Sequence, residues 1–349
     1  MAIRRFSKKA ADILTIKASF FEENDALVAQ SLRWAEIYKQ QPRRVRCKNC
    51  DGILGDPLFG KLGIDYILCS TCGHLNGGHE DTAEFVKHIY TNSDSDYADF
   101  YKSSSKEKFL EWVSAIYQPK VDFLSDCLIS LGERPAQLSY CDVGAGSGRF
   151  LYALLKGCGC EQAVGYEVSP RQVDFGNAMI GRQCLKLQDV TDTARIIRQC
   201  EADVVSMIGV LEHLRDPRNV LDELSKNTKI RYLYLCLPLF SPSVYFELLN
   251  QDLYNRQLSV DHTHLYTKSS IDWFSKEFGL ESVGEWFFGT DMVDLYRFML
   301  LQMRKKKCSA AMQKHLADQW IPMIDKLQGV IDETEFCSEI HILLKRRQK

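Results

Sequence analysis

The sequence predicts an α/β fold built around a mostly parallel sheet, with a small cysteine-rich module in front of it. From Leu138 onward, short apolar runs alternate with segments of helical periodicity, a pattern typical of consecutive βαβ units. Before that point, residues 43–76 lack helical periodicity and are rich in glycine, cysteine and turn-forming residues. These two observations divide the chain into a module and a larger sheet domain.

Length and composition suit a soluble globular chain with one large domain. The 349 residues include 45% hydrophobic and 26% charged residues, which are ordinary values. Lys and Arg number 44 against 46 Asp and Glu, so the net charge is -2. Because phosphate neutralisation dominates nucleic-acid affinity, the lack of a basic excess argues against a nucleic-acid partner. We expect a small-molecule substrate instead.

We expect the protein in the cytoplasm and not in a membrane. The basic N-terminus is not followed by the apolar segment of a signal peptide. The longest apolar runs, such as 232–240, are far too short to span a bilayer. Thirteen cysteines, scattered through predicted helices and strands, argue against a secreted disulfide framework.

Changes in periodicity and composition along the chain predict its parts in order. Apolar residues at three-and-four spacing indicate a helix at 26–38, and again at 109–129. A polar stretch rich in Ser, Asp and Tyr separates the module from the second of these helices. The predicted parts are an N-terminal helix (1–40), the cysteine module (41–80), a linker or lid with the helix that leads into the main domain (81–130), and the main domain (131–349) with a helical insertion at about 294–331.

The main domain is predicted to alternate strands with helices. Helices are expected to begin near Arg149, Pro170, Thr193 and Pro217, and a further helix covers 269–278. The expected strands are 139–143, 162–166, 184–187, 204–208, 232–237, 280–287 and 338–345.

A glycine-rich loop lies where the first of these strands turns into a helix. Its sequence is Asp142-Val143-Gly144-Ala145-Gly146-Ser147-Gly148, and Arg149 opens the helix. Such a turn favours glycine because the backbone takes positive φ and comes close to a ligand. The helix N-terminus adds free N–H groups and a partial positive charge. A lone glycine-rich loop also occurs in dinucleotide-binding domains.

Polar residues at the ends of the next two strands give further support to the prediction of a nucleoside-binding site. Glu167 ends the second strand, where a carboxylate accepts hydrogen bonds from both ribose hydroxyls. Asp189 or Gln188 ends the third strand, in position to meet an adenine amino group. The residues predicted to bind the cofactor are Asp142, Gly144, Ala145, Gly146, Gly148, Glu167, Val168, Asp189, Val190 and Gly209.

This pattern resembles the class I methyltransferases. Asp142–Gly148 is similar to their first motif, Glu167 to their ribose-binding acid, and Val210–His213 to the segment after the fourth strand of many small-molecule members. The resemblance covers about 135–290 and the last strand. It implies a Rossmann-like methyltransferase sheet with an antiparallel terminal strand, and S-adenosylmethionine as cofactor. The alternative is another Rossmann protein such as a dehydrogenase, whose loop is normally G-x-G-x-x-G and not G-x-G-x-G.

Four cysteines form two C-x-x-C pairs, Cys47 with Cys50 and Cys69 with Cys72. Two such pairs at this spacing are typical of a four-thiolate zinc site, in which each pair supplies two ligands. Four thiolates complete the coordination shell, so we expect the zinc to be structural. The alternatives are redox chemistry or two pairs of buried cysteines; a redox C-x-x-C usually stands alone at the start of a helix.

The combination of this module with the sheet domain resembles the sugar C-methyltransferases of deoxysugar biosynthesis, which act on nucleotide-linked keto-sugars. The resemblance implies that Glu212 and His213 take part in deprotonating the acceptor, and that Tyr97 or Tyr101 lines the site. Those enzymes carry a sizeable third domain after the core. Here only the insertion and the last strand follow, which leaves open whether the acceptor is a sugar and whether carbon is methylated.

Histidines near two strand ends are the candidates for a general base. His213 follows the fourth strand, at the carboxyl edge where open α/β sheets bind ligands. A histidine beside a carboxylate titrates near neutrality and suits proton removal. His262 and His264 lie beyond the fifth strand and point the same way only if their segment is extended. Either His213 or the His262/His264 pair is the expected base.

We therefore expect methyl transfer to a small polar acceptor, favoured by the resemblance to be a sugar or nucleotide-linked sugar, at carbon or oxygen. An RNA or protein methyltransferase is the first alternative, with Arg43–Arg46 as the nearest basic patch. A non-catalytic binding protein with the same fold is the second. The chain is expected to be a monomer or a homodimer.

Overall fold

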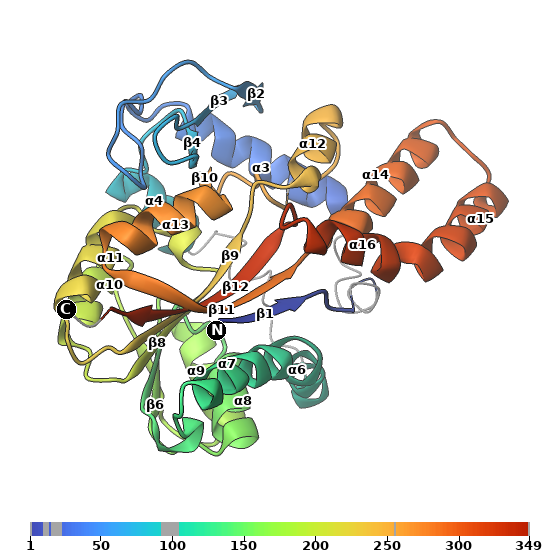
Figure 1. The fold of residues 1–349 in the computed structure, drawn as a ribbon. Coiled ribbons are helices and arrows are strands. Elements are labelled where there is room, and N and C mark those ends of the chain that lie inside the picture. The colour runs from blue at the N-terminus through green and yellow to red at the C-terminus, as the bar shows by residue number, and fades with distance from the viewer. Residues whose placement is uncertain (1, 10–13, 15–22, 92–104, 255, 348–349) are drawn as a thin grey trace.

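The computed structural model describes the chain except for residues 1, 10–13, 15–22, 92–104, 255 and 348–349 (Figure 1). A central sheet of eight strands has the order β1-β11-β12-β9-β8-β5-β6-β7. The strands are β1 (Ile3–Phe6), β5 (Tyr140–Val143), β6 (Ala163–Glu167), β7 (Leu185–Leu187), β8 (Val204–Ile208), β9 (Tyr232–Pro238), β11 (Leu280–Phe288) and β12 (Glu339–Arg346). Seven of them lie within one residue of the bounds predicted from the sequence.

All pairings in this sheet are parallel except those of β12. That strand runs antiparallel to both of its neighbours, β9 and β11, and so lies inside the sheet and not at its edge. The prediction of a mostly parallel sheet with an antiparallel terminal strand is confirmed. Its carboxyl edge, where β5, β6, β8 and β9 end, therefore also contains the start of β12.

Residues 3–6 differ from the prediction of a helical N-terminus, because they form β1 beside β11. Ile3 packs on one face of the sheet and Phe6 on the other, as the alternation of a strand requires. The Trp286 indole N–H donates to the Ser7 carbonyl at 2.9 Å, just after β1 ends. A four-residue strand is too short to show a period, so only its distant partner identifies it.

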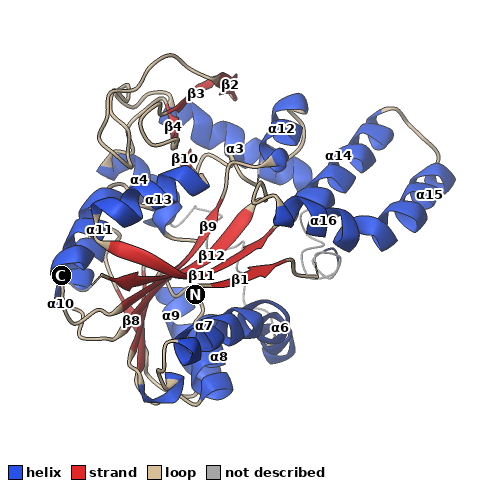
Figure 2. Ribbon diagram, in the orientation of Figure 1, coloured by secondary structure: helices blue, strands red, loops and turns tan. Residues whose placement is uncertain are grey.

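Helices cover both faces of the sheet (Figure 2). Tyr140 and Cys141 show the alternation of a doubly covered strand, since they point into different cores. One core contains α6 (Lys106–Trp112), a π-helical turn (Val113–Tyr117), α7 (Gln118–Ser130), α8 (Arg149–Ala153) and α9 (Pro170–Ile180). The other contains α10 (Thr193–Gln199), α11 (Pro217–Lys226) and α13 (Lys268–Glu277).

Side-chain caps fix the start of several of these helices. The Ser169 and Asp216 side chains accept from backbone N–H groups at the starts of α9 and α11, and proline follows each cap. Thr267 and Ser270 form a capping box at the start of α13. These local signals explain why the helix starts could be predicted from the sequence.

The cysteine-rich segment forms a second sheet with the order β10-β4-β3-β2. Its strands are β2 (Phe59–Lys61), β3 (Ile64–Leu68), β4 (Leu75–Gly77) and β10 (His264–Leu265), flanked by α3 (Asn24–Tyr38) and α4 (Ala83–Thr91). β10 comes from the main domain and pairs with β4. Figure 1 shows this layer above the carboxyl edge of the central sheet. The module is thus joined to the main domain by backbone pairing.

Helices α14 (Asp291–Lys305), α15 (Ala310–Trp320) and α16 (Ile324–Glu333) separate β11 from β12 and project to the right in Figure 1. Their base is held by Asp291, which is fully buried. It accepts hydrogen bonds from Ser241 and Ser243 near the start of α12 (Pro242–Leu249), from Gln328 in α16 and from the Ser338 N–H before β12.

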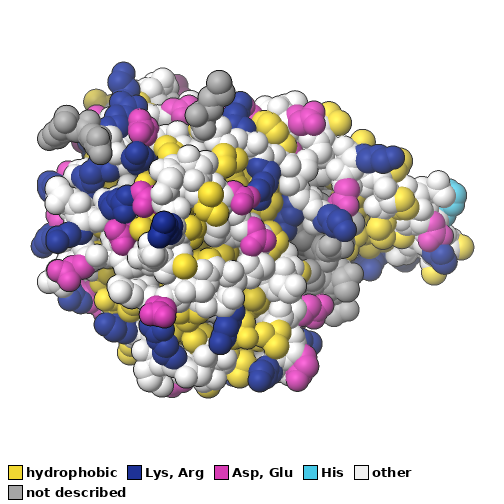
Figure 3. All heavy atoms as spheres, turned by 60° about the horizontal axis from the view of Figure 1, so that its bottom comes forward, with side chains coloured by type: hydrophobic (Ala, Val, Ile, Leu, Met, Phe, Trp, Pro, Cys, Tyr) yellow, Lys and Arg dark blue, Asp and Glu magenta, His cyan; other side chains and the backbone are white. Residues whose placement is uncertain are grey.

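Side chains of both signs are interspersed over the face drawn in Figure 3, and apolar side chains lie among them. Within the described residues, no helix combines the length and the apolar character that crossing a bilayer requires.

Asp291→Ala is expected to lower the free energy of unfolding by about 3 kcal/mol or more, because it leaves several buried donors without an acceptor. Urea denaturation measures the change. Asp318→Ala in α15 is the matched control: the Asp318 side chain forms an ion pair with Lys314 and is 53% exposed. That control should change stability by less than about 0.5 kcal/mol. Equal effects of the two variants would contradict the role given to Asp291.

Candidate active site

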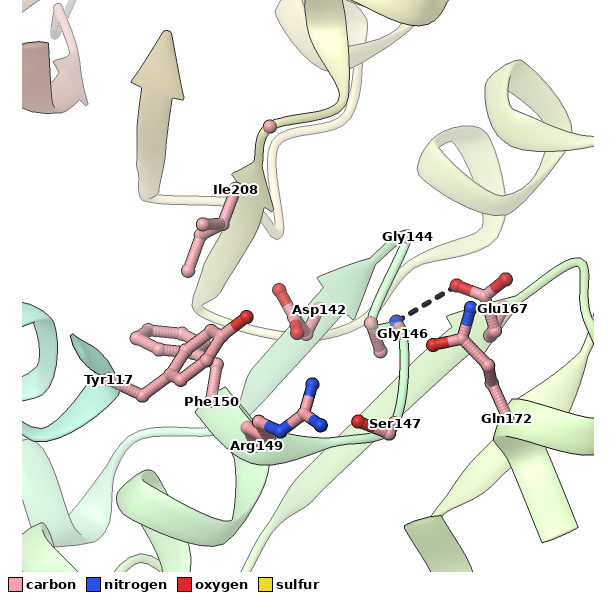
Figure 4. Close-up of a pocket in the computed structure, with 12 residues that line it drawn as sticks. Tyr117, Asp142, Gly144, Gly146, Ser147, Arg149, Phe150, Glu167, Gln172 and Ile208 are labelled. Carbon is pink, nitrogen blue, oxygen red and sulfur yellow. Dashed lines mark hydrogen bonds between the residues drawn. The ribbon is translucent and has the colours of Figure 1, made fainter. Parts of the chain in front are cut away.

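A cleft opens at the glycine loop between β5 and α8 (Figure 4). Gly144 has φ of 70°, and a Cβ at this position would lie 2.5 Å from the Val210 side chain. Gly148 has φ of 73° and packs closely against Ile180 and Leu185. Any side chain at either position would force the loop away from β8 or α9. The residues that line the cleft are Tyr117, Asp142, Gly144, Ala145, Gly146, Ser147, Arg149, Phe150, Glu167, Gln172, Ile208 and Gly209.

Two buried carboxylates lie in the cleft at the ends of neighbouring strands. Asp142, at the end of β5, accepts a hydrogen bond of 2.6 Å from the Ser206 hydroxyl, and burial raises its pKa to about 7. Glu167, at the end of β6, accepts from the backbone N–H groups of Gly146, Val168 and Ser169 at 2.8–2.9 Å. Burial raises the pKa of Glu167 as well.

The other predicted cofactor residues are placed differently. Gly148 packs under the glycine loop, and the Val168 N–H donates a hydrogen bond to the Glu167 carboxylate. Neither residue lines the cleft. Asp189 is exposed and accepts from Thr191, so it is not aimed at the cleft. Val190 lines a separate groove that also contains His213.

Gln188, the alternative to Asp189, has a buried Oε1 without a hydrogen-bond partner among the described residues. Its backbone N–H donates to the Glu167 carbonyl at 2.9 Å, which places Gln188 beside the cleft acid. The structure therefore favours Gln188 over Asp189 as the polar side chain at the end of β7.

A second group of polar side chains follows Gly209 in space. It consists of Glu212, His213 and His262. One carboxylate oxygen and one ring nitrogen from each histidine all lie within 4.8 Å of one another. The His213 and His262 ring centroids are 4.7 Å apart. Glu212 is buried, and its Oε2 has no partner among the described residues. A Cβ on Gly209 would lie 3.6 Å from Glu212 Oε1, so this cluster adjoins the glycine-loop cleft.

The ionisation of this cluster differs from the expectation of a histidine that titrates near neutrality. Burial and the neighbouring His262 lower the pKa of His213 to about 4. Burial raises the pKa of Glu212 to about 8, with a further rise from the charges of Glu339 and Asp261. At neutral pH the proton therefore resides on Glu212, and His213 is a neutral imidazole.

Tyr90, from α4, contacts His213. Its hydroxyl lies 2.7 Å from His213 Nδ1, and the two rings meet edge to face. Sequence analysis missed it because Tyr90 lies in a helix before the Ser/Tyr-rich stretch. Tyr97 and Tyr101, which were predicted for this role, lie outside the described residues.

His262 and His264 separate, although they are only two residues apart. His262 turns toward His213, and its Nδ1 lies 3.0 Å from the Gln257 carbonyl. His264 is fully buried in β10, where its Nδ1 lies 2.8 Å from His74 Nε2. His264 therefore packs against β4 of the cysteine module, away from His213, whereas His262 lies in the cluster with His213.

The sulfur atoms of the four predicted zinc ligands lie close together. One sulfur atom from each of Cys47, Cys50, Cys69 and Cys72 lies within 4.8 Å of the other three. The Cys47 and Cys72 sulfurs are 3.7 Å apart, and those of Cys50 and Cys69 are 3.5 Å apart. These distances and the donor set fit a tetrahedral thiolate site.

A sequence model of the methyltransferase domain family matches residues 109–285, about half of the chain. Comparison with curated proteins gave no match. Similar solved structures include the magnesium protoporphyrin IX methyltransferase of Synechocystis PCC 6803, which is 13% identical, with coverage of 75% of this chain and 92% of the other and a TM-score of 0.43. A SAM-dependent methyltransferase of Archaeoglobus fulgidus is 16% identical, with coverages of 70% and 100% and a TM-score of 0.40. The plantazolicin methyltransferase BamL is 11% identical, with coverages of 75% and 94% and a TM-score of 0.46.

Glu212→Gln is expected to stabilise the chain relative to wild type increasingly as pH rises from 4.5 toward about 8. The raised pKa means that the folded state keeps a proton that the unfolded state has already released, so wild type loses stability across this window. Thermal melts at pH 5 and pH 8.5 measure the difference between variant and wild type. A difference in melting temperature that does not change with pH would contradict the assignment.

Proposed function

We infer that the chain, which belongs to the methyltransferase domain family and is a methyltransferase, takes its methyl group from S-adenosylmethionine and transfers it to a small polar acceptor. One observation carries this inference. The cleft at the glycine loop adjoins the Glu212–His213–His262 cluster across Gly209. A nucleoside site and a proton-accepting group thus lie side by side at the carboxyl edge of the sheet, where open α/β proteins bind ligands.

The residues of the cleft fit this donor. Glu167 suits the ribose hydroxyls, since a buried carboxylate at the end of the second strand can accept from both. The unpartnered Gln188 Oε1 suits the adenine amino group, which is a donor. Asp142 suits a positive charge, because a cation would favour its ionised form. When bound, S-adenosylmethionine supplies an electrophilic methyl group on a positively charged sulfur.

His213 is proposed as the general base for the acceptor. Its Nδ1 lies near the Tyr90 hydroxyl and the Asp261 carbonyl, at 2.7 and 3.2 Å. With a proton on Nδ1 donated to these oxygens, Nε2 keeps a free lone pair and can accept a proton. The imidazolium that forms is stabilised by the Asp261 carboxylate, whose pKa stays low despite burial because of the two histidines and the Ser259 hydroxyl.

The acceptor proposed is a sugar or nucleotide-linked sugar, methylated at carbon or oxygen. The support is the combination of a cysteine module, a tyrosine from the following segment, and the Glu-His pair after the fourth strand. Tyr90, whose hydroxyl lies 2.7 Å from His213 Nδ1, is a further candidate for that tyrosine beside Tyr97 and Tyr101. The preference for a sugar comes from the family resemblance in sequence, and a screen of nucleotide-sugars with a labelled methyl donor tests it.

The Cys47, Cys50, Cys69 and Cys72 cluster is proposed to hold a structural zinc ion. Four thiolates leave no coordination position for a substrate. The neighbouring side chains support the loop that carries the first cysteine pair: the Asn76 amide oxygen accepts from the Lys48 N–H at 2.9 Å. The ion would therefore fix the base of the module and not take part in methyl transfer.

Calorimetry is expected to show binding of S-adenosylhomocysteine and no binding of NAD. His213→Ala should keep that binding and lower turnover by about 100-fold or more, as the loss of a general base does. Turnover is measured with a labelled methyl donor on a panel of nucleotide-sugars. His315→Ala, on the exposed surface of α15, is the matched control and should leave turnover unchanged. Binding of NAD alone would overturn the proposed donor, and unchanged turnover in His213→Ala would overturn the base.

Purified protein is expected to contain about one zinc per chain, measured by elemental analysis. Cys72→Ser should lower the zinc content and reduce the melting temperature by about 5 °C or more, because metal binding adds to the free energy of folding. Cys308→Ser, outside the cluster, should change neither quantity. A metal-free protein that melts at the same temperature as the zinc-loaded one would contradict a structural ion.

A further inference from the structure

A backbone carbonyl next to His213 is bound by a lysine of the cysteine module. The Lys48 ammonium group donates to the Leu214 carbonyl at 2.7 Å. Lys48 lies between the two cysteines of the first C-x-x-C pair, and Leu214 directly follows His213. His213 ends a single 3₁₀ turn, in which the Leu214 N–H reaches the Leu211 carbonyl only at 3.4 Å. Because the hydrogen bonds of such a turn are few and poorly aligned, the position of His213 depends on what holds the ends of the turn.

Lys48 is itself fixed at both ends of its side chain. Its side chain is 2% exposed and forms an ion pair with Asp81, whose side chain is 3% exposed. Its backbone N–H donates to the Asn76 amide oxygen at 2.9 Å. An ammonium group is costly to take out of water unless its protons find acceptors. The Leu214 carbonyl therefore completes the partners of a buried charge, and the contact is directional.

Asn49, the next residue, links the same loop to two helices of the main domain. Its side-chain amide donates to the Ser270 carbonyl in α13 at 3.0 Å, and its own carbonyl accepts from Arg218 in α11 at 3.2 Å. Asn49 is 3% exposed. Since α11 begins shortly after Leu214, the loop between the cysteines holds the segment after His213 both at its start and in the helix that follows.

The cysteine module is attached to the main domain elsewhere as well. β10 pairs with β4, and the buried Lys61 ammonium group donates to the Glu247 carbonyl in α12. Apolar side chains can hold such an interface at least as well as a buried ion pair. What Lys48 adds is a directional bond to one carbonyl, and that carbonyl adjoins the proposed base.

We propose that Lys48 is a positioning residue for methyl transfer: together with Asn49 it holds the turn that carries His213, so that the imidazole keeps its orientation against Tyr90 and Asp261. This inference rests on the proposed role of His213 and deepens it, because it gives the cysteine module a part in the reaction through two named side chains. Lys48 does not touch the acceptor and acts only through His213.

The test is Lys48→Met, which keeps the apolar stem of the side chain and removes the ammonium group. Arg44 still pairs with Asp81, at 3.4 Å, so the carboxylate keeps a partner. The kcat on the best acceptor of the nucleotide-sugar panel should fall by about 10-fold or more, as displacement of a catalytic group does. The Kd of S-adenosylhomocysteine and the KM of the acceptor should change by less than about 3-fold, because only the base is displaced.

A second readout needs no acceptor. In protein labelled with ¹⁵N-histidine, the Nδ1–H resonance of His213 is assigned by its absence from His213→Ala. Lys48→Met should shift or broaden this resonance, because the ring loses its fixed position against the Tyr90 hydroxyl and the Asp261 carbonyl.

Lys61→Met is the matched control, since Lys61 is also a buried lysine of the module that donates to a backbone carbonyl of the main domain. It should lower the melting temperature, yet leave kcat within about 2-fold of wild type and the His213 resonance in place. The double variant Lys48→Met/His213→Ala separates positioning from general loosening. Because Lys48 acts through the imidazole, its removal should cost less than about 2-fold further once His213 is gone.

Wild-type kcat in Lys48→Met, or a loss of the same factor with and without His213, would overturn the positioning role. An unchanged His213 resonance in Lys48→Met would do the same where no acceptor is found. If Lys48→Met does not fold, Asn49→Ala replaces it, because this change removes one hydrogen bond and no charge. It should lower kcat by about 3-fold and move the same resonance, and wild-type values of both would contradict the proposal. Full turnover in His213→Ala would instead overturn the proposed base, so the two failures are distinguishable.

Discussion

Close contact between the Gly144 backbone and the Val210 side chain sets the geometry on which both halves of the site depend. The absence of a Cβ at Gly144 lets the segment after β8 approach the loop after β5. As a result, Gly209 lines the glycine-loop cleft, while Glu212 and His213, a few residues later, belong to the neighbouring cluster. A larger residue at Gly144 would push the segment after β8 away from the loop after β5, and with it the Glu212–His213–His262 cluster away from the cleft.

Burial of titratable groups at the carboxyl edge of the central sheet decides which of them carries a proton. Glu212 and His213 lie side by side, yet their pKa values are moved in opposite directions, so the carboxyl group holds the proton and the imidazole is free. The sequence suggested instead a histidine that titrates near neutrality, because a neighbouring carboxylate in water raises the proton affinity of an imidazole. Desolvation outweighs that attraction here, and it depends on packing that no local sequence pattern reveals.

Features that depend on local sequence were predictable, and features that depend on distant partners were not. The glycine loop, the helix starts at Pro170 and Pro217, and the C-x-x-C pairs are encoded within a few residues. By contrast, β1 and β10 are short strands whose partners lie far away in the chain, and Tyr90 reaches His213 across 123 residues. The separation of His262 from His264 follows from the pairing of β10 with β4, which alternation alone could not predict.

The position of β12 has a consequence for the order in which the protein is assembled. β9 and β11 are not neighbours; the strand at Glu339–Arg346 fills the space between them. During synthesis both flanking strands leave the ribosome before the one that joins them, so β1 and β11 cannot dock on the remaining strands until this late segment arrives. While α14, α15 and α16 are being made, the edges of β9 and β11 that will later pair with β12 are therefore unpaired, and such edges are prone to pair with other chains.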